Sequence, residues 1–262
     1  MSLYFQLLAS GSKGNSILVC SAKTRVLIDA GLSGKELVRR MDMGDIQARN
    51  LDAIVISHEH QDHVKGMGVM SRRFDLPVYL SQGTLDKIPP QVGQLDHLQI
   101  FLPGSAFAIG DLQVRPFAIS HDAGEPCGFI IQNGKTRLGV CTDLGVATHL
   151  VKTRLKECHG LILEANHDMD MLLKGPYPLH LKQRIRSRHG HLSNEDTCEL
   201  LKSVYHEALQ VVVFAHLSEV NNHPDLVADG FQRLCRVSQW HSVHFAIGSQ
   251  SNVTPVFELA GT

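Results

Sequence analysis

Residues 54–63 read Ile-Val-Ile-Ser-His-Glu-His-Gln-Asp-His, and this stretch decides how the rest of the chain is interpreted. Its first part is a short apolar run, which is typical of a buried β-strand. Three histidines and one carboxylate follow directly, namely His58, His60, Asp62 and His63. Neutral imidazole and carboxylate are ligands that divalent transition metals accept. The stretch therefore predicts a strand that ends in a metal site.

The spacing within this stretch indicates room for two ions. His58 and His60 are two residues apart, so both side chains can point the same way while the backbone stays extended. Asp62 and His63 follow in the turn before the next helix and can face a second ion. A surface loop that is merely rich in histidine is the alternative. With 16 histidines among 262 residues, such a string arises by chance in only roughly a few per thousand chains.

The composition predicts one ordinary globular domain over residues 1–262, because 43% of the residues are hydrophobic and 19% are charged. The net charge of −1 excludes a strong pull of the whole molecule on nucleic acid or anionic lipid, so recognition must come from local patches. No apolar run is long enough to span a bilayer, and residues 1–8 lack the layout of a signal peptide. We therefore expect a cytoplasmic protein that does not bind membranes. None of the six cysteines forms a C-x-x-C pair, so reduced thiols are expected.

Short apolar runs alternate with helix-like stretches, which predicts an α/β fold with helices packed outside sheets. Strands are expected at Tyr4–Leu8, Ser16–Cys20, Arg25–Asp29, Ala53–Ser57, Val78–Leu80, Gln113–Ile119, Gly128–Gln132, Arg137–Cys141, Gly160–Leu163, Val211–Ala215 and Val243–Ile247. Helices are expected at Gly34–Met41, Val64–Arg73, Ala147–Glu157, Asn194–His206 and Pro224–Leu234.

The histidine motif resembles the signature of the metallo-β-lactamase superfamily, and the resemblance implies a four-layer αββα sandwich. It also implies three further ligands, each following a strand: His121, Asp143 and His216. By this resemblance one ion has His58, His60, His121 and Asp143, and the other has Asp62, His63, His216 and Asp143. Each of the three has an alternative interpretation. His121 could simply be exposed, His216 could support a ligand from behind, and Asp143 could occupy an ordinary turn.

The implied ligand set predicts hydrolysis without a side-chain nucleophile. Two divalent ions roughly 3.5–4 Å apart can share a hydroxide that is nucleophilic at neutral pH. The same ions polarise an acyl or phosphoryl oxygen and stabilise negative charge. The chain has no G-x-S-x-G motif that would supply a serine nucleophile. Because no cysteine is among the expected ligands, Zn, Mn and Fe all remain candidates.

Two segments between Asp143 and His216 resemble those of tRNase Z-type nucleases: Glu164 in Leu-Glu-Ala-Asn-His-Asp and His191 in Gly-His-Leu-Ser-Asn. The resemblance implies that His191 is the general acid and that Glu164 orients it and raises its pKa. A phosphodiester releases an alkoxide, and an imidazolium held by a carboxylate can give it a proton. The alternative is that His191 only precedes a helix cap and Glu164 only ends a core strand.

Several segments could bind a phosphate backbone. Residues 171–194 contain five cations and no acidic residue, namely Lys174, Lys182, Arg184, Arg186 and Arg188. Such a run can bind phosphates, although charge runs are also common on solvated surfaces. The glycines of the loop Ser10–Ser16 permit an anion nest, to which Ser12, Lys13 and Asn15 could add donors; a flexible hairpin loop is the alternative. The amides of Asn221 and Asn222 could contact substrate or form a turn before Pro224.

In combination these motifs, with Gly-Pro-Tyr-Pro at residues 175–178, resemble the YycJ/WalJ branch of the superfamily over about residues 5 to 225. The resemblance implies 5′→3′ exonuclease activity, with DNA favoured over RNA as the nucleic-acid partner, and a link to DNA mismatch repair. A small-molecule thioester or lactone hydrolase is the alternative, and it would have no use for Glu164, His191 or the basic segment. A non-catalytic metal-bound scaffold is a third possibility. The sequence does not indicate an oligomeric state.

Overall fold

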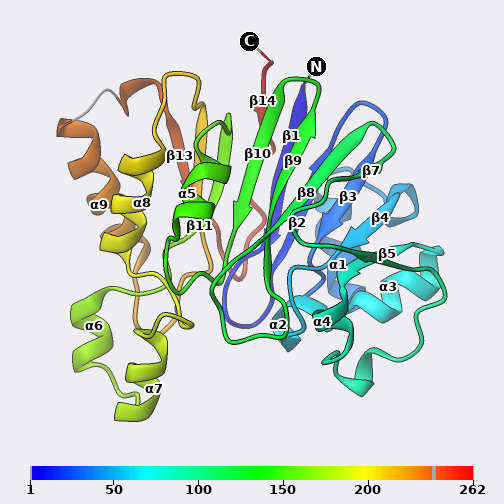
Figure 1. The fold of residues 1–262 in the computed structure, drawn as a ribbon, viewed down its shortest axis with the longest axis horizontal. Coiled ribbons are helices and arrows are strands. Elements are labelled where there is room, and N and C mark those ends of the chain that lie inside the picture. Colours follow the sequence, from blue (N-terminus) through cyan, green and yellow to red (C-terminus); the bar gives the residue numbers. More distant parts are fainter. Residues whose placement is uncertain (1, 238–239, 262) are drawn as a thin grey trace.

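Two β-sheets pack face to face and helices cover their outer faces in the computed structural model, which describes residues 2–237 and 240–261 (Figure 1). In spatial order the first sheet contains β14 (Phe257–Leu259), β1 (Leu3–Ala9), β2 (Ser16–Cys20), β3 (Arg25–Ile28), β4 (Ala53–Val55), β5 (Val78–Ser81) and β6 (Leu98–Phe101). The second sheet contains β13 (His244–Ile247), β12 (Val211–Ala215), β11 (Gly160–Glu164), β10 (Thr136–Cys141), β9 (Cys127–Asn133), β8 (Leu112–Ala118) and β7 (Phe107–Ile109). This arrangement is the expected αββα sandwich.

The helices divide into three groups. The first sheet is accompanied by α1 (Gly34–Met43), α2 (Gln61–Val64), α3 (Met67–Phe74) and α4 (Gln82–Leu85), and the second by α5 (His149–Leu155), α8 (Asn194–Val204) and α9 (Pro224–Val237). Two short helices, α6 (Met169–Lys174) and α7 (Leu179–Ile185), hang below α8 at the lower left of Figure 1. Single 3-10 turns occur at Ala48–Asn50, Pro90–Val92 and Trp240–Ser242. Within the described ranges, no helix has the length and apolar character needed to cross a membrane.

Alternation along the strands produces three apolar layers. Val26 and Ile28 of β3 point into the layer between the sheets, where they join Phe129 of β9. Leu27, between them in sequence, points outward and packs with Leu37 of α1. Successive side chains of a strand point to opposite faces, so an apolar run such as 26–28 is buried on both sides. The central strands therefore make apolar contacts on both faces, and these contacts determine where the carboxyl ends of the strands lie.

The carboxyl ends of parallel strands meet at one edge of each sheet. In the first sheet β3 pairs in parallel with β4. In the second sheet β10 pairs in parallel with β11, and β11 with β12. The segments that follow these strands therefore emerge together, and they contain the residues singled out in the sequence.

All eleven expected strands are present, and four of the five expected helices are present as single helices. The prediction of one continuous helix at 64–73 is wrong, because the structure has two helices, α2 and α3, that are separated at Lys65 and Gly66. Gly66 donates its amide to Ala30 O at 2.7 Å, and a Cβ at Gly66 would lie 2.3 Å from Leu32 O. This close approach to the loop after β3 interrupts the helix. The sequence did not predict β6, β7, β14, α4, α6 or α7.

Candidate metal centre

The seven expected ligands lie together at the edge where the parallel strands end. Ligand atoms of His58, His60 and His121 lie within 4.8 Å of one another, and so do those of Asp62, His63 and His216. The two groups are adjacent, because Asp143 Oδ2 is 3.2 Å from His63 Nε2 while Asp143 Oδ1 is 3.8 Å from His121 Nε2. Segments more than a hundred residues apart in sequence therefore converge on one point.

Asp29 holds His63 from behind. Its Oδ2 atom accepts a hydrogen bond from His63 Nδ1 at 2.7 Å, and Ser57 donates its amide to Oδ1 and its hydroxyl to Oδ2, both at 2.8 Å. Because Nδ1 donates to Asp29, the lone pair of His63 Nε2 faces the cluster. Asn15 lies on that side, with Nδ2 3.2 Å from Asp62 Oδ2. The sequence analysis missed Asp29, although a carboxylate at the end of an apolar strand beside β4 was a usable signal.

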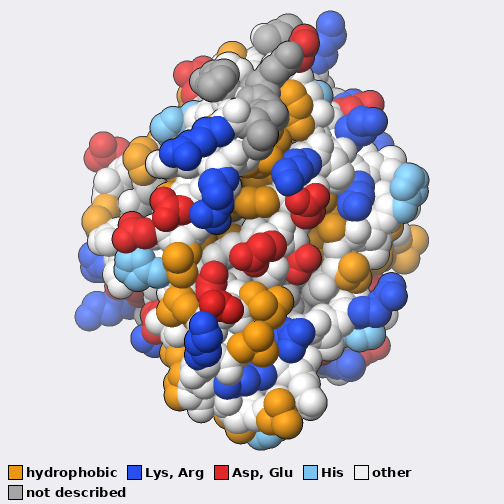
Figure 2. Space-filling model, turned by 90° about the vertical axis from the view of Figure 1, so that its left-hand side faces the viewer, with side chains coloured by type: hydrophobic (Ala, Val, Ile, Leu, Met, Phe, Trp, Pro, Cys, Tyr) orange, Lys and Arg blue, Asp and Glu red, His pale blue; other side chains and the backbone are white. Residues whose placement is uncertain are grey.

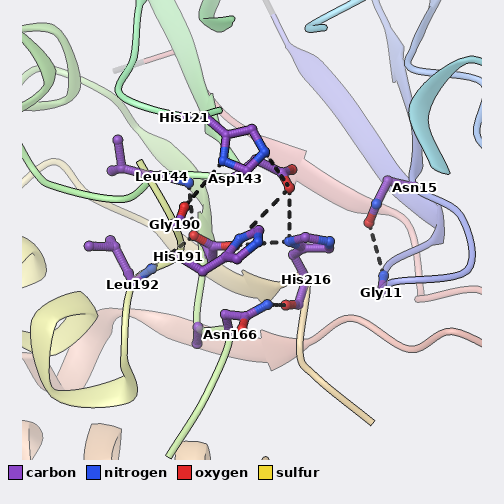
Figure 3. A network of polar contacts seen from close by, with 12 residues as sticks. Gly11, Asn15, His121, Asp143, Leu144, Asn166, Gly190, His191, Leu192 and His216 are labelled. Atoms are coloured by element: carbon purple, nitrogen blue, oxygen red, sulfur yellow. Dashed lines mark hydrogen bonds and ion pairs between the residues drawn. The ribbon is translucent and has the colours of Figure 1, made fainter. Parts of the chain in front are cut away.

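Glu164 serves the opposite side of the cluster. Its Oε1 atom lies 2.7 Å from His191 Nδ1 and 2.9 Å from His216 Nδ1. Its Oε2 atom accepts hydrogen bonds from the amides of Leu144 at 2.8 Å and Leu192 at 3.0 Å. Figure 3 shows the rings of His191 and His216 side by side, with Asp143 and His121 facing them. One buried carboxylate thus orients an expected ligand and the expected general acid together.

The pKa values of this pair move in opposite directions. Burial disfavours the ionised form of Glu164, but the positive charge of His191 and the hydrogen bonds from His191 and His216 outweigh it and lower the pKa of Glu164 to about 2. Burial also disfavours the cationic form of His191. The charge of Glu164 and its hydrogen bond outweigh burial and raise the pKa of His191 above its usual value. The structure therefore favours an imidazolium on His191 beside a carboxylate on Glu164.

The loops that carry the cluster adopt backbone conformations that side chains rarely occupy. Asp29, Asp143 and His216 all have positive φ angles, between 56° and 61°. Such left-handed conformations cost free energy and are concentrated at functional sites. Asp29 and His216 directly follow β3 and β12, and Asp143 lies two residues after the end of β10. The abrupt turn directs the side chain toward the cluster instead of along the strand.

The donor set fits divalent metal ions. Asp143 Oδ2 and His216 Nε2 are buried and have no hydrogen-bond partner among the described residues. Buried polar atoms are nearly always paired, and a role in binding an ion is one accepted reason for an exception. Both atoms belong to groups of imidazole and carboxylate whose ligand atoms lie within 4.8 Å of one another. These are ligands suited to Zn, Mn or Fe.

A pocket of about 260 Å³ opens onto the cluster. His60, Asp62, His121, Asp143, His191 and His216 line its polar side, and Ser12, Arg184 and Ser218 are also part of the lining. Two of the seven side chains expected to bind substrate, Ser12 and Arg184, therefore reach this pocket. Arg184 is paired with Asp122, Nε to Oδ2 at 2.6 Å.

The other residues expected to bind substrate have different surroundings. Asn221 and Asn222 are buried, with 0% and 6% of their surface exposed, which disfavours the expected contact with substrate. Asn222 donates to Ala165 O at 2.8 Å, which explains its burial. Asn15 is buried at 4% exposure and is hydrogen-bonded within the cluster, so it supports Asp62 and His63 from inside the protein. Lys13 forms an ion pair with Glu219 at 2.6 Å, and Arg186 is exposed.

Comparison with known proteins shows which family the chain belongs to. A family model described as "Beta-lactamase superfamily domain" matches residues 24–216. The chain therefore belongs to the β-lactamase superfamily, and its class is that of the metal-dependent hydrolases with the metallo-β-lactamase fold.

Two relatives are similar to this chain over most of its length. The chain is 37% identical to exodeoxyribonuclease YycJ of Bacillus anthracis, over 86% of each chain. It is 35% identical to exodeoxyribonuclease WalJ of Streptococcus pneumoniae, over 97% of each chain. Among solved structures, the metallo-β-lactamase fold protein YhfI of Bacillus subtilis superposes with a TM-score of 0.74 at 16% identity, covering 98% of this chain and 100% of that one. The last similarity supports the fold alone.

Proposed function

We propose that the chain is a metal-dependent nuclease that hydrolyses phosphodiester bonds of DNA from the 5′ end. The observation that carries this proposal is the Glu164–His191 pair, which lies beside the His/Asp cluster and opens into the same pocket. A thioester hydrolase would not need such a proton donor, because a thiolate leaves without a proton. The names of the two curated relatives, both exodeoxyribonucleases, support DNA as the substrate. Because both sheets supply side chains to the cluster, we propose that residues 1–262 act as a single domain.

In this proposal two divalent ions occupy the cluster, one held by His58, His60 and His121 and one by Asp62, His63 and His216, with Asp143 between them. The ions, when bound, supply an activated water as the nucleophile and positive charge for the phosphoryl oxygens. Zn, Mn and Fe are the candidates that these ligands suit.

His191 donates the proton that the leaving oxygen needs. Its Nδ1 is held by Glu164, so Nε2 is the nitrogen that can reach a substrate in the pocket. The side chain is 21% exposed, which is enough for contact with a bound phosphodiester. The raised pKa of His191 keeps the proton available near neutral pH. Glu164 acts through His191, so it is a positioning residue.

The test uses DNA and RNA labelled at the 5′ or the 3′ end, with added Mn or Zn. We expect 5′-directed cleavage of DNA and a loss on the order of a hundredfold in His191→Ala. The same variant should retain most activity on bis(p-nitrophenyl) phosphate, because a nitrophenolate leaves without a proton. An unchanged rate of DNA cleavage in His191→Ala would contradict the assigned role. Absence of nucleic-acid cleavage with either metal would contradict the proposed function itself.

A further inference from the structure

The Gly-Pro-Tyr-Pro segment at 175–178 and the helix α7 that follows it have no part in the proposed chemistry, yet they form one wall of the pocket. Tyr177, Leu181 and Ile185 belong to the lining of the pocket, together with His60 and Asp62. The pocket therefore has a polar half, which contains the candidate metal ligands, and an aromatic and apolar half. A site that binds only phosphate would not need the aromatic and apolar part of the pocket.

The aromatic residue of this wall is held rigidly. Pro176 and Pro178 flank Tyr177, and a proline restricts both its own φ and the conformation of the residue before it. Gly175 fits tightly, because a Cβ there would lie 2.6 Å from Met171 O and 2.7 Å from Asn221 Oδ1. The buried Asn221 thus supports the segment from below. A restricted backbone at Tyr177 lowers the conformational entropy that is lost when its ring binds a flat ligand.

The wall is also fixed relative to the catalytic groups. Lys182 Nζ donates to Leu173 O at 2.7 Å, which joins α7 to α6. Arg184 pairs with Asp122, next to His121 in sequence. The amide of His191 donates to Ile185 O at 2.9 Å. The distance between the wall and the proton donor is therefore set by the backbone.

The shape of the pocket limits what can enter it. Its volume is about 260 Å³, and Asp143, His121 and His216, which belong to its lining, are all buried. A phosphate inside a duplex cannot reach a recessed centre of this kind without the terminal base pair opening. Enzymes that do chemistry on a base meet a similar barrier, and they act on single strands or on nucleotides extruded from the duplex.

We propose that Tyr177, with Leu181 and Ile185, binds the base of the terminal nucleotide, so that the enzyme requires an unpaired end. This inference rests on the proposed nuclease function and names the substrate class of that site. The base stacks on Tyr177 while its phosphodiester lies at the His/Asp cluster. The lower end of the molecule carries Lys and Arg side chains beside hydrophobic ones (Figure 2). Helices α6 and α7 contribute the exposed Leu173 and Leu179. The cations include Arg186 and Arg188, which are exposed where the adjoining phosphates would pass.

The test compares three DNA substrates of one sequence: a 5′ overhang, a blunt duplex, and an overhang whose terminal nucleotide is abasic. We expect the overhang to be cleaved fastest. Loss of one base stack should raise KM for the abasic overhang roughly tenfold to a hundredfold while kcat changes little. Equal KM for the abasic and intact overhangs, or a blunt duplex cleaved as fast as the overhang, would overturn the inference and leave the nuclease function intact. Cleavage of none of the three would overturn both.

Variants of the wall complete the test. Tyr177→Ala should raise KM for the intact overhang and abolish the difference between intact and abasic ends, because the base then has no partner. Tyr177→Phe should behave as the unchanged protein, since stacking needs the ring alone. Leu179→Ala is the matched control, because Leu179 lies two residues after Tyr177 at the start of α7, is 70% exposed and is not part of the pocket lining. A Tyr177→Ala variant with an unchanged KM would contradict the proposal.

Discussion

Asp29 shows at the scale of one residue how the candidate site is held. This carboxylate is not among the groups proposed to bind metal, but it fixes the tautomer and the ring orientation of His63. Carboxylate partners of metal-binding histidines commonly contribute a factor of about 10–100 to metal affinity. We therefore expect Asp29→Asn to weaken binding at the Asp62–His63–His216 group about 10–100-fold, measured by competition with a chelator.

The control for this change is Asp42→Asn, which makes the same substitution on the exposed face of α1. It should leave metal affinity unchanged. Equal affinities in Asp29→Asn and the unchanged protein would mean that Asp29 only stabilises the loop after β3. In that case a lowered melting temperature without loss of metal should be observed.

His167 makes stability depend on pH. Its ring is buried and both nitrogens lack a hydrogen-bond partner among the described residues. Burial lowers its pKa to about 4. The unfolded chain binds a proton on His167 near pH 6.5, whereas the folded protein binds it only near pH 4. The stability that comes from keeping His167 neutral is therefore fully present above pH 6.5. It is lost as pH falls from about 6.5 toward 4.

From pH 7 to pH 5 the loss due to His167 should reach about 2 kcal/mol of unfolding free energy. We expect His167→Leu to show a pH dependence that is smaller by this amount, measured by urea unfolding at both pH values. Loss of bound metal on acidification affects both proteins and cancels in the comparison. If the unfolding free energies of the two proteins changed by the same amount between pH 7 and pH 5, His167 would bind its proton equally well in the folded and unfolded states, which would contradict the lowered pKa.

At the scale of elements, the turn before α8 sets the position of the proposed general acid. Gly190 O lies 3.2 Å from His121 Nδ1, and His191 follows directly. A Cβ at Gly190 would lie 2.1 Å from Ile185 O and 2.3 Å from Arg184 O, which are backbone atoms that cannot move independently. We expect Gly190→Ala to cost roughly 1–3 kcal/mol of stability and to reduce nuclease activity more than metal content.

Gly230→Ala is the matched control, because it makes the same change in α9, where the nearest atom to the new Cβ is Cys198 Sγ at 3.6 Å. Replacement of a glycine inside a helix by alanine should add about 0.5–1 kcal/mol of stability. Opposite signs for the two variants, measured by thermal unfolding, would support the close contact at Gly190. A neutral Gly190→Ala would show that the turn can relax.

Some elements could be predicted from the sequence and others could not. Strands such as β2 and β12 match their expected ranges residue for residue, because an apolar run bounded by polar residues has one interpretation when both faces are buried. Helix α7 has only seven residues and none of them is buried, so its apolar pattern is too short to predict a helix. Contacts with distant residues, such as Arg184 with Asp122, maintain it. The aromatic wall of the pocket was therefore not predictable.

At the scale of the whole molecule, the candidate ligands were predicted from the sequence, whereas the contacts of Asp29 with His63 and of Glu164 with His216 were not. His58, His60, Asp62 and His63 are adjacent in sequence, so their chemistry is visible there. Asp29 lies in a different segment, and its relation to His63 arises only when β3 pairs with β4. The burial of Asn221 and Asn222 follows from packing around α6 and α8 in the same way. Residue type can indicate a ligand, but the three-dimensional contacts decide which polar residues face substrate.

The most direct test of the central proposal is the metal content of the purified protein, measured by mass spectrometry after loading with Zn or Mn and removal of unbound metal. We expect two ions per chain, and fewer than one in Asp143→Ala, because Asp143 lies between the two ligand groups. His97→Ala is the control, because this exposed histidine pairs with Asp75 and belongs to neither ligand group. It should retain both ions. Two ions per chain in Asp143→Ala, or no stoichiometric metal in the unchanged protein, would contradict a metal pair at this site.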